Sequence, residues 1–135
     1  MHTTNYVDTF IELAEDSPVT AAQEPPVKEV PTVAQLHYEL IAQAPYALTS
    51  DDVVFETHAR RAGIAPADRE AARAAFFAKG QPCLRSSPLG KRYGWGVHSD
   101  AEGRVALVPA RSDEYARLAA DPDIRHTRAM RTKRA

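Results

Sequence analysis

Two short runs decide the fold of this sequence: Tyr93-Gly94-Trp95-Gly96-Val97-His98-Ser99 and Arg104-Val105-Ala106-Leu107-Val108. Asp100, Ala101, Glu102 and Gly103 separate them with the composition of a short loop, and Pro109 ends the second run. Two strand-like runs around such a loop predict a β-hairpin. Because a lone hairpin is only marginally stable in water, we expect a further strand to join it.

The N-terminus supplies that strand. In residues 6–13, Ile11 lies on one face and Phe10 on the other. Helical patterns fill most of the rest, with Thr32 capping the first and Gly63 ending the second. The expected helices are 33–44, 50–62, 66–79 and 113–120. Since strands and helices are segregated, we predict an α+β fold. A small antiparallel sheet (N-terminal strand plus C-terminal hairpin) packs on one face against three to four helices.

The length of 135 residues, 44% of them hydrophobic, predicts a single domain spanning 1–135. Residues 16–31 hold Pro18, Pro25, Pro26 and Pro31 and are expected to form a mobile Pro-rich loop. Residues 122–135 form a basic C-terminal tail. We expect this tail to be a solvated terminus, with contact to nucleic acid or an acidic partner as the alternative.

The expected compartment is the cytoplasm. No apolar run approaches the ~20 residues that cross a bilayer, so we expect no membrane association. The first residues lack the pattern of a signal peptide. Cys83 is the single cysteine, which excludes an intrachain disulfide and suits a reducing environment.

The charges are unevenly divided along the chain. Residues 1–60 hold ten acids and two bases, or −8, whereas residues 61–135 hold eight acids and fifteen bases, or +7. We interpret this mainly as attraction between the two halves within the fold. A partner-binding face is the alternative.

The segment from Arg85 to His98 is the candidate ligand site. In strand geometry Gly94, Gly96 and His98 share one face and form a bare trough, which favours close approach of a ligand or of another element. The cations and hydroxyls beside the trough suit a phosphate or carboxylate. We predict a binding module for an anionic, phosphorylated ligand or a nucleic-acid strand. Its candidate residues are Arg85, Ser86, Ser87, Lys91, Arg92, Tyr93, Gly94, Trp95, Gly96 and His98.

Three other functions are kept as alternatives, although we favour a binding module over an enzyme. A small enzyme would use Cys83 as nucleophile and His98 as base. A winged-helix DNA-binding protein would read DNA with Arg69 and Arg73 on the helix 66–79. A subunit-interaction protein would show an exposed apolar patch to its protein partner.

No metal or cofactor is expected. His37 and His58 lie on the apolar stripes of two predicted helices, and with Cys83 or His98 they supply metal-binding side chains. The chain contains no CxxC, HxxxH or HExxH spacing, however. We therefore interpret both histidines as core-edge residues satisfied by a hydrogen bond.

Several segments carry a resemblance to a known family. They are His2-Thr3-Thr4-Asn5-Tyr6, Asp8-Thr9-Phe10-Ile11-Glu12, Thr49-Ser50-Asp51-Asp52-Val53, Ser87-Pro88-Leu89, Lys91-Arg92-Tyr93-Gly94-Trp95-Gly96 and Ala129-Met130-Arg131. Through them the sequence resembles, over nearly its whole length, a bacterial family of short uncharacterised proteins catalogued as a domain of unknown function. The resemblance implies no activity, cofactor or ligand.

Overall fold

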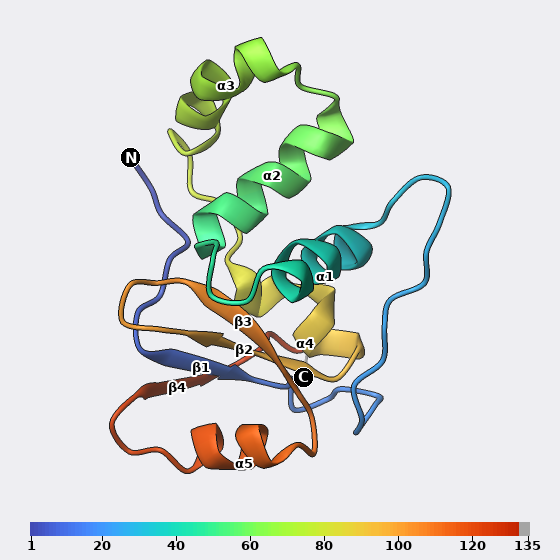
Figure 1. Ribbon diagram of the computed structural model, residues 1–135, viewed down its shortest axis with the longest axis vertical. Helices are drawn as coiled ribbons and strands as arrows, with labels where there is room; N and C mark the ends of the chain where they lie inside the picture. The colour runs from blue at the N-terminus through green and yellow to red at the C-terminus, as the bar shows by residue number, and fades with distance from the viewer. Residues whose placement is uncertain (133–135) are drawn as a thin grey trace.

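A four-stranded sheet forms the centre of the computed structural model, which describes residues 1–132 (Figure 1). Its strands are β1 (Thr9–Glu12), β2 (Trp95–Ser99), β3 (Val105–Pro109) and β4 (Arg125–Arg128). The helices are α1 (Val33–Gln43), α2 (Ser50–Ala62), α3 (Arg69–Phe76), α4 (Pro88–Arg92) and α5 (Asp113–Ala119), with 3₁₀ turns η1 (Pro66–Asp68) and η2 (Leu84–Ser86). The predicted α+β class is confirmed, in a single domain.

The strands lie side by side in the order β3-β2-β1-β4. β2 and β3 form the predicted antiparallel hairpin, with Val97 opposite Leu107. β1 joins β2 in antiparallel register, with Phe10 opposite His98. β4 pairs with β1 in parallel, so the sheet is mixed and not purely antiparallel as predicted.

β4 lies in the segment that is expected from the sequence to be a solvated basic tail. The backbone N–H of Arg125 donates to Asp8 at 2.7 Å, and that of Ala129 donates to Glu12 at 2.8 Å. Ala129 is buried in the core. The strand was missed because an exposed edge strand of polar residues shows no apolar alternation. Residues 133–135, the end of the predicted tail, lie outside the described residues.

Helices cover both faces of the sheet, which corrects the prediction of one covered face (Figure 1). Ile11 and Val97 lie in a core with Ile41 of α1 and Val53 of α2. On the opposite face, Phe10 packs with residues of β3 and α5. Phe10 and Ile11 are neighbours with 0% and 2% exposure, so β1 is apolar on both sides and requires two covering layers.

The helix ends follow local capping chemistry. Thr32 accepts the backbone N–H of Gln35 at 3.2 Å, as predicted for the start of α1. Thr49 and Asp52 form a reciprocal capping box that begins α2 at Ser50. The predicted helix 66–79 is divided into η1 and α3 and ends at Phe76. α4 was not predicted because its one turn is too short to show a period.

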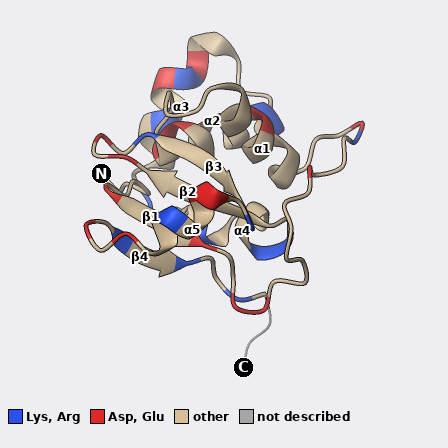
Figure 2. Ribbon diagram, turned by 60° about the horizontal axis from the view of Figure 1, so that its bottom comes forward, with Lys and Arg blue, Asp and Glu red and all other residues tan. Residues whose placement is uncertain are grey.

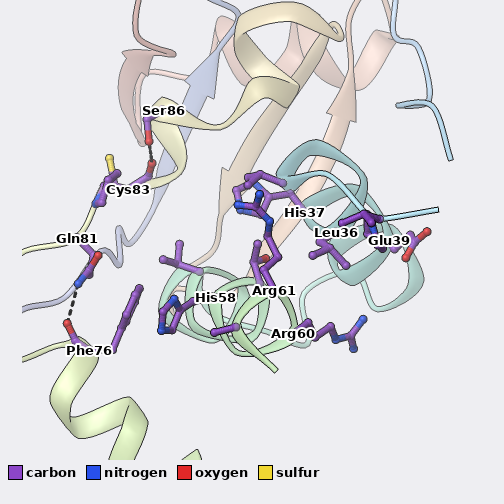
Figure 3. A pocket seen from close by; sticks show the side chains of 17 residues that line it. Leu36, His37, Glu39, His58, Arg60, Arg61, Phe76, Gln81, Cys83 and Ser86 are labelled. Atoms are coloured by element: carbon purple, nitrogen blue, oxygen red, sulfur yellow. Dashed lines mark hydrogen bonds between the residues drawn. The ribbon is translucent and has the colours of Figure 1, made fainter. Parts of the chain in front are cut away.

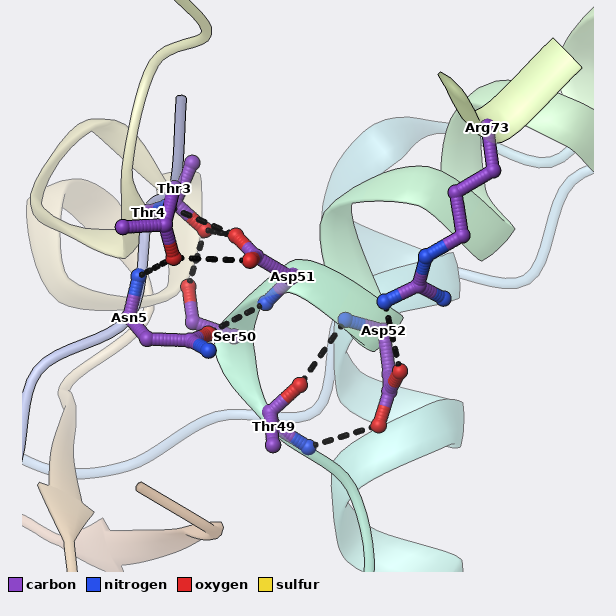
Figure 4. Close-up of polar contacts among 8 residues, drawn as sticks. All are labelled: Thr3, Thr4, Asn5, Thr49, Ser50, Asp51, Asp52 and Arg73. Carbon is purple, nitrogen blue, oxygen red and sulfur yellow. Dashed lines mark hydrogen bonds and ion pairs between the residues drawn. The ribbon is translucent and has the colours of Figure 1, made fainter. Parts of the chain in front are cut away.

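An N-terminal clasp, Thr3, Thr4 and Asn5 on Asp51, fastens the start of the chain to α2 (Figure 4). The Asp51 carboxylate accepts both threonine hydroxyls at 2.7 Å and the backbone N–H of Thr4 at 2.6 Å. The N–H of Asp51 donates to the Asn5 side chain at 2.8 Å. Two of the segments that carry the family resemblance thus serve to join distant parts of the chain.

The Pro-rich segment 16–31 contains no helix or strand, as predicted. Its middle is held to the sheet and α1. The backbone N–H of Gln23 donates to Tyr93 at 2.8 Å, Trp95 Nε1 donates to the Gln23 carbonyl at 2.8 Å, and Tyr38 donates to Glu24 at 3.0 Å. Gln23 and Glu24 are therefore fixed to the rest of the fold. The exposed residues on either side of them are still predicted to be mobile.

Acidic and basic residues are interspersed along the chain in the view of Figure 2, without a region that holds one sign of charge alone. Within residues 1–132, three ion pairs join an acid of residues 1–60 to a base of residues 61–135. They are Arg69–Glu56, Arg73–Asp52 and Arg131–Glu15. These pairs support the interpretation that the two halves attract each other within the fold.

Candidate functional site

The predicted glycine trough is filled by protein. A Cβ atom added to Gly96 would lie 2.7 Å from the Phe10 ring and 3.0 Å from the Tyr115 ring. A Cβ added to Gly94, whose φ is +79°, would lie 2.4 Å from the Ala21 carbonyl oxygen. Both glycines allow close packing of the chain against itself, so the interpretation of the trough as ligand contact is corrected.

The three cations of the predicted site do not converge. Arg85 Nε donates to the Arg128 carbonyl at 2.7 Å, which ties η2 to β4. Lys91 is half-buried, whereas Arg92 is exposed beside Tyr93 at a small cavity of about 180 Å³. None of the three makes an ion pair with another described residue.

The remaining candidate side chains take structural hydrogen bonds. Ser86 donates to the Cys83 carbonyl at 2.7 Å, and Ser87 accepts the backbone N–H of Leu89 at 3.2 Å at the start of α4. His98 Nδ1 lies 2.8 Å from the Tyr46 hydroxyl, and burial lowers the pKa of His98. Together with Trp95, bound to Gln23, these residues are distributed over both faces of the sheet.

Cys83 and His98 are also separated, which argues against the predicted nucleophile–base pair. His98 shares the α5 face of the sheet with Phe10 and Gly96, because these residues oppose or alternate in the register. Cys83 lies on the α1–α2 side, 3.4 Å from the Tyr6 hydroxyl. Burial and the neighbouring Cys83 thiol raise the pKa of Tyr6. The sheet therefore lies between the two proposed catalytic side chains.

The positions of Arg69 and Arg73 argue against the winged-helix interpretation. Arg69 pairs with Glu56, and Arg73 donates to Asp52 at 2.9 Å, so both arginines of α3 point to α2. Burial raises the pKa of Asp52, but hydrogen bonds from Thr49 and Arg73 outweigh it and lower that pKa. The arginines that would read DNA are used to hold two helices together.

A cavity of ligand size lies elsewhere, in what we call the α1–α2 pocket (Figure 3). It has a volume of about 930 Å³ and is bounded by α1, α2, the last residue of α3 and residues 81–86. Of the residues predicted for the ligand site only Ser86 lines it, together with Cys83, His37 and His58 from the alternatives considered from the sequence. Its size falls within the ~300–1,000 Å³ typical of small-molecule sites.

His37 contributes a neutral donor to this pocket. Its Nδ1 lies 2.8 Å from the Ser87 oxygen, and burial lowers the pKa of His37 to about 4. The Ser87 hydroxyl can accept the N–H of Leu89 and at the same time donate to Nδ1, and we assign this arrangement to the pair. The ring hydrogen is then on Nε2, which makes no other bond to described residues. The prediction that His37 is a hydrogen-bonded core-edge histidine is confirmed.

Arg61 supplies the positive charge of the pocket. It is exposed and makes no hydrogen bond or ion pair with the part of the chain that the structure describes. Figure 3 shows its side chain extending from α2 towards His37. Arg60, its neighbour, lies 3.8 Å from Glu56, and Glu39 at the other wall accepts from Gln35 at 3.0 Å. Arg61 is thus a cation available to a ligand.

Thr57 lies on α2 one turn before Arg61 and also lines the pocket. Its side chain is 5% exposed, and its hydroxyl oxygen has no hydrogen-bond partner among residues 1–132. A buried hydroxyl without a partner costs about 1–3 kcal/mol. The pocket wall therefore carries a polar group that the fold itself does not satisfy.

An aromatic wall completes the pocket. The His58 ring stacks on the Phe76 ring with centroids 4.6 Å apart, and His58 is exposed and makes no hydrogen bond to a described residue. The prediction of a hydrogen-bonded core-edge histidine is therefore wrong for His58.

His37, His58 and Cys83 all line this pocket, but no group of three or more His, Cys, Asp or Glu within residues 1–132 is placed to hold a metal.

The pocket could not be predicted from the sequence because its residues come from four separate segments. The signal that was present is the spacing of Thr57 and Arg61, four residues apart and therefore on one helix face. The core stripe predicted for α2 comprised Val54, Phe55, His58, Ala59 and Ala62, of which Phe55 and Ala59 are buried, whereas Val54 and His58 line the pocket. His58 and Arg61 therefore lie at the pocket and not in the core.

Comparisons with known proteins give the family of the chain. Among residues 1–132, no helix is long and apolar enough to cross a membrane. No curated protein and no solved structure matches the sequence. The family described as "Family of unknown function (DUF6157)" matches residues 1–135, which confirms the resemblance found from the sequence segments. The chain therefore belongs to the family of unknown function DUF6157.

Proposed function

We propose that this protein is a small binding module that holds an organic anion in the α1–α2 pocket. The observation that carries the proposal is Arg61, an unpaired guanidinium at the wall of a cavity of about 930 Å³. An arginine that makes no internal ion pair binds carboxylate or phosphate groups well, because its planar donors match their oxygens. An anionic ligand was also expected from the sequence, but in the Arg85–His98 region and not in the α1–α2 pocket.

The neighbouring groups support an organic ligand. The Nε2–H of neutral His37 is a second donor near Arg61 (Figure 3). Apolar side chains such as Leu36, Val54 and Phe76 form much of the remaining wall. A mostly apolar cavity with a few converging polar groups is the usual form of a small-molecule site.

The proposed compartment is the reducing cytoplasm. Cys83 is a free thiol that lines the pocket, and it is the single cysteine of the chain. A single free thiol is typical of compartments in which thiols are kept reduced.

The test is a thermal-shift screen against organic carboxylates, sugar phosphates, nucleotides and short oligonucleotides. A ligand that binds only the folded protein at a hundredfold excess over its Kd adds about 2.7 kcal/mol of stability. We expect organic anions to raise the midpoint in the wild type and not in Arg61→Ala. Arg92→Ala is the matched control, because Arg92 is an exposed arginine outside the pocket.

The opposite pattern would contradict the proposal. A shift that survives Arg61→Ala and disappears in Arg92→Ala would locate binding in the Arg85–His98 region first expected from the sequence. If oligonucleotides raise the midpoint in the wild type and in Arg61→Ala but not in Arg92→Ala, a nucleic-acid partner is favoured. If no anion changes the midpoint, the protein partner becomes the better hypothesis.

A further inference from the structure

We propose that the ligand of the α1–α2 pocket is a monocarboxylate with an apolar body, a specificity that rests on the function proposed above. The first argument is the charge of the pocket. The charged residues of its lining are Arg60, Arg61 and Glu39, which sum to +1. The unpaired positive charge of Arg61 matches a ligand that carries one negative charge.

A phosphate monoester does not fit this balance. It carries a charge of about −1.5 to −2 at pH 7 and presents three acceptor oxygens. Beside Arg61 the pocket offers the neutral Nε2–H of His37, which donates a hydrogen bond but no charge. The acidic Glu39 on the α1 wall would add repulsion to a second negative charge.

The two donors match the two oxygens of a carboxylate. The guanidinium of Arg61 binds carboxylate oxygens through its planar N–H groups, and its side chain extends towards His37, whose Nε2–H is the second donor (Figure 3). Both side chains are anchored on helices, Arg61 on α2 and His37 on α1. His37 is further fixed by its bond to Ser87 at 2.8 Å.

The apolar body follows from the rest of the wall. Val33 and Leu36 of α1 face the pocket with Val54 of α2, and the stacked pair His58–Phe76 forms a flat surface. Such a surface favours a ring or a chain over a hydroxylated sugar, because sugar hydroxyls would lose water without gaining partners.

The test compares ligands that share one body and differ in the polar group. Isothermal titration is performed with naphthoate, naphthamide and naphthyl phosphate, and with octanoate as an aliphatic carboxylate. We expect a carboxylate to bind at least about tenfold more tightly than naphthamide, the loss of one charge-assisted bond being worth ~1.4 kcal/mol or more. Naphthyl phosphate is expected to bind more weakly than naphthoate.

Variants locate the carboxylate. Arg61→Ala is expected to weaken carboxylate binding at least about tenfold and to leave naphthamide unchanged, whereas Arg92→Ala changes neither. Circular dichroism and thermal midpoints verify that each variant is folded. Tighter binding of naphthyl phosphate would overturn the carboxylate specificity and keep the proposed function. Absence of binding by both carboxylates also overturns it. Carboxylate binding that is insensitive to Arg61→Ala overturns the proposed function as well.

Discussion

Thr57→Val is expected to make the protein more stable, although it alters a residue that is 5% exposed. Valine has nearly the shape of threonine, with a methyl group in place of the hydroxyl. In this protein the Thr57 hydroxyl has no partner among the described residues. The substitution therefore removes an unsatisfied polar group without opening a cavity.

The magnitude follows from that environment. An unpartnered buried hydroxyl costs about 1–3 kcal/mol, and threonine and valine have similar helix propensities. Allowing for partial relaxation around the hydroxyl, we expect a gain of about 1–2 kcal/mol in the free energy of unfolding. For a domain between 100 and 150 residues, this corresponds to a rise in Tm of roughly 3–8 °C.

The assay is denaturant and thermal unfolding of Thr57→Val beside Thr57→Ser. The serine variant keeps the hydroxyl and loses a methyl group, so it is expected to lose about 1 kcal/mol. If Thr57→Val instead lowers stability by 1 kcal/mol or more, the hydroxyl makes a bond that stabilises the fold. The reasoning that it is an unsatisfied group in the pocket wall would then be refuted.

Three further predictions follow from other sites. Burial lowers the pKa of His37 from 6.5 to about 4, so the folded state binds fewer protons than the unfolded state between these values. Stability should fall by about 3 kcal/mol as the pH drops through this range, and urea titrations of His37→Gln should show a flatter pH profile. An unchanged profile would mean that His37 is not the titrating group. Asp51→Ala removes the acceptor of the N-terminal clasp and should cost about 2–4 kcal/mol, with Asp51→Asn in between. Equal stability of the three proteins in urea would show that the clasp is not formed in solution. Gly96→Ala introduces the clash with Phe10 at 2.7 Å and should cost about 1–3 kcal/mol in thermal unfolding, whereas a neutral effect would contradict the packed trough.

The parts of the fold that could be predicted are those with local periodicity or capping. The hairpin, β1 and the start of α1 follow from strand alternation and from the Thr32 cap. β4 could not be predicted in this way, because its pairing with β1 depends on backbone bonds that any residue can make. The second covering layer was present as a signal in the adjacent apolar pair Phe10 and Ile11.

The candidate site was harder to predict because it depends on which side chains are left without partners. Gly94 and Gly96 looked open in the sequence, but Ala21 and Phe10 fill the space beside them from distant segments. Arg61 had no feature that distinguished it from other arginines. Its availability becomes visible only once Arg69 and Arg73 are paired with Glu56 and Asp52.

The most direct test of the α1–α2 pocket is a two-dimensional NMR titration of ¹⁵N-labelled protein with naphthoate. The account predicts that amide shifts are confined to the residues around Leu36, His37 and Arg61, and that Arg61→Ala needs at least about tenfold more naphthoate to produce them. Shifts centred on Arg92 and Gly94, unchanged in Arg61→Ala, would contradict the account and would locate the site on the hairpin.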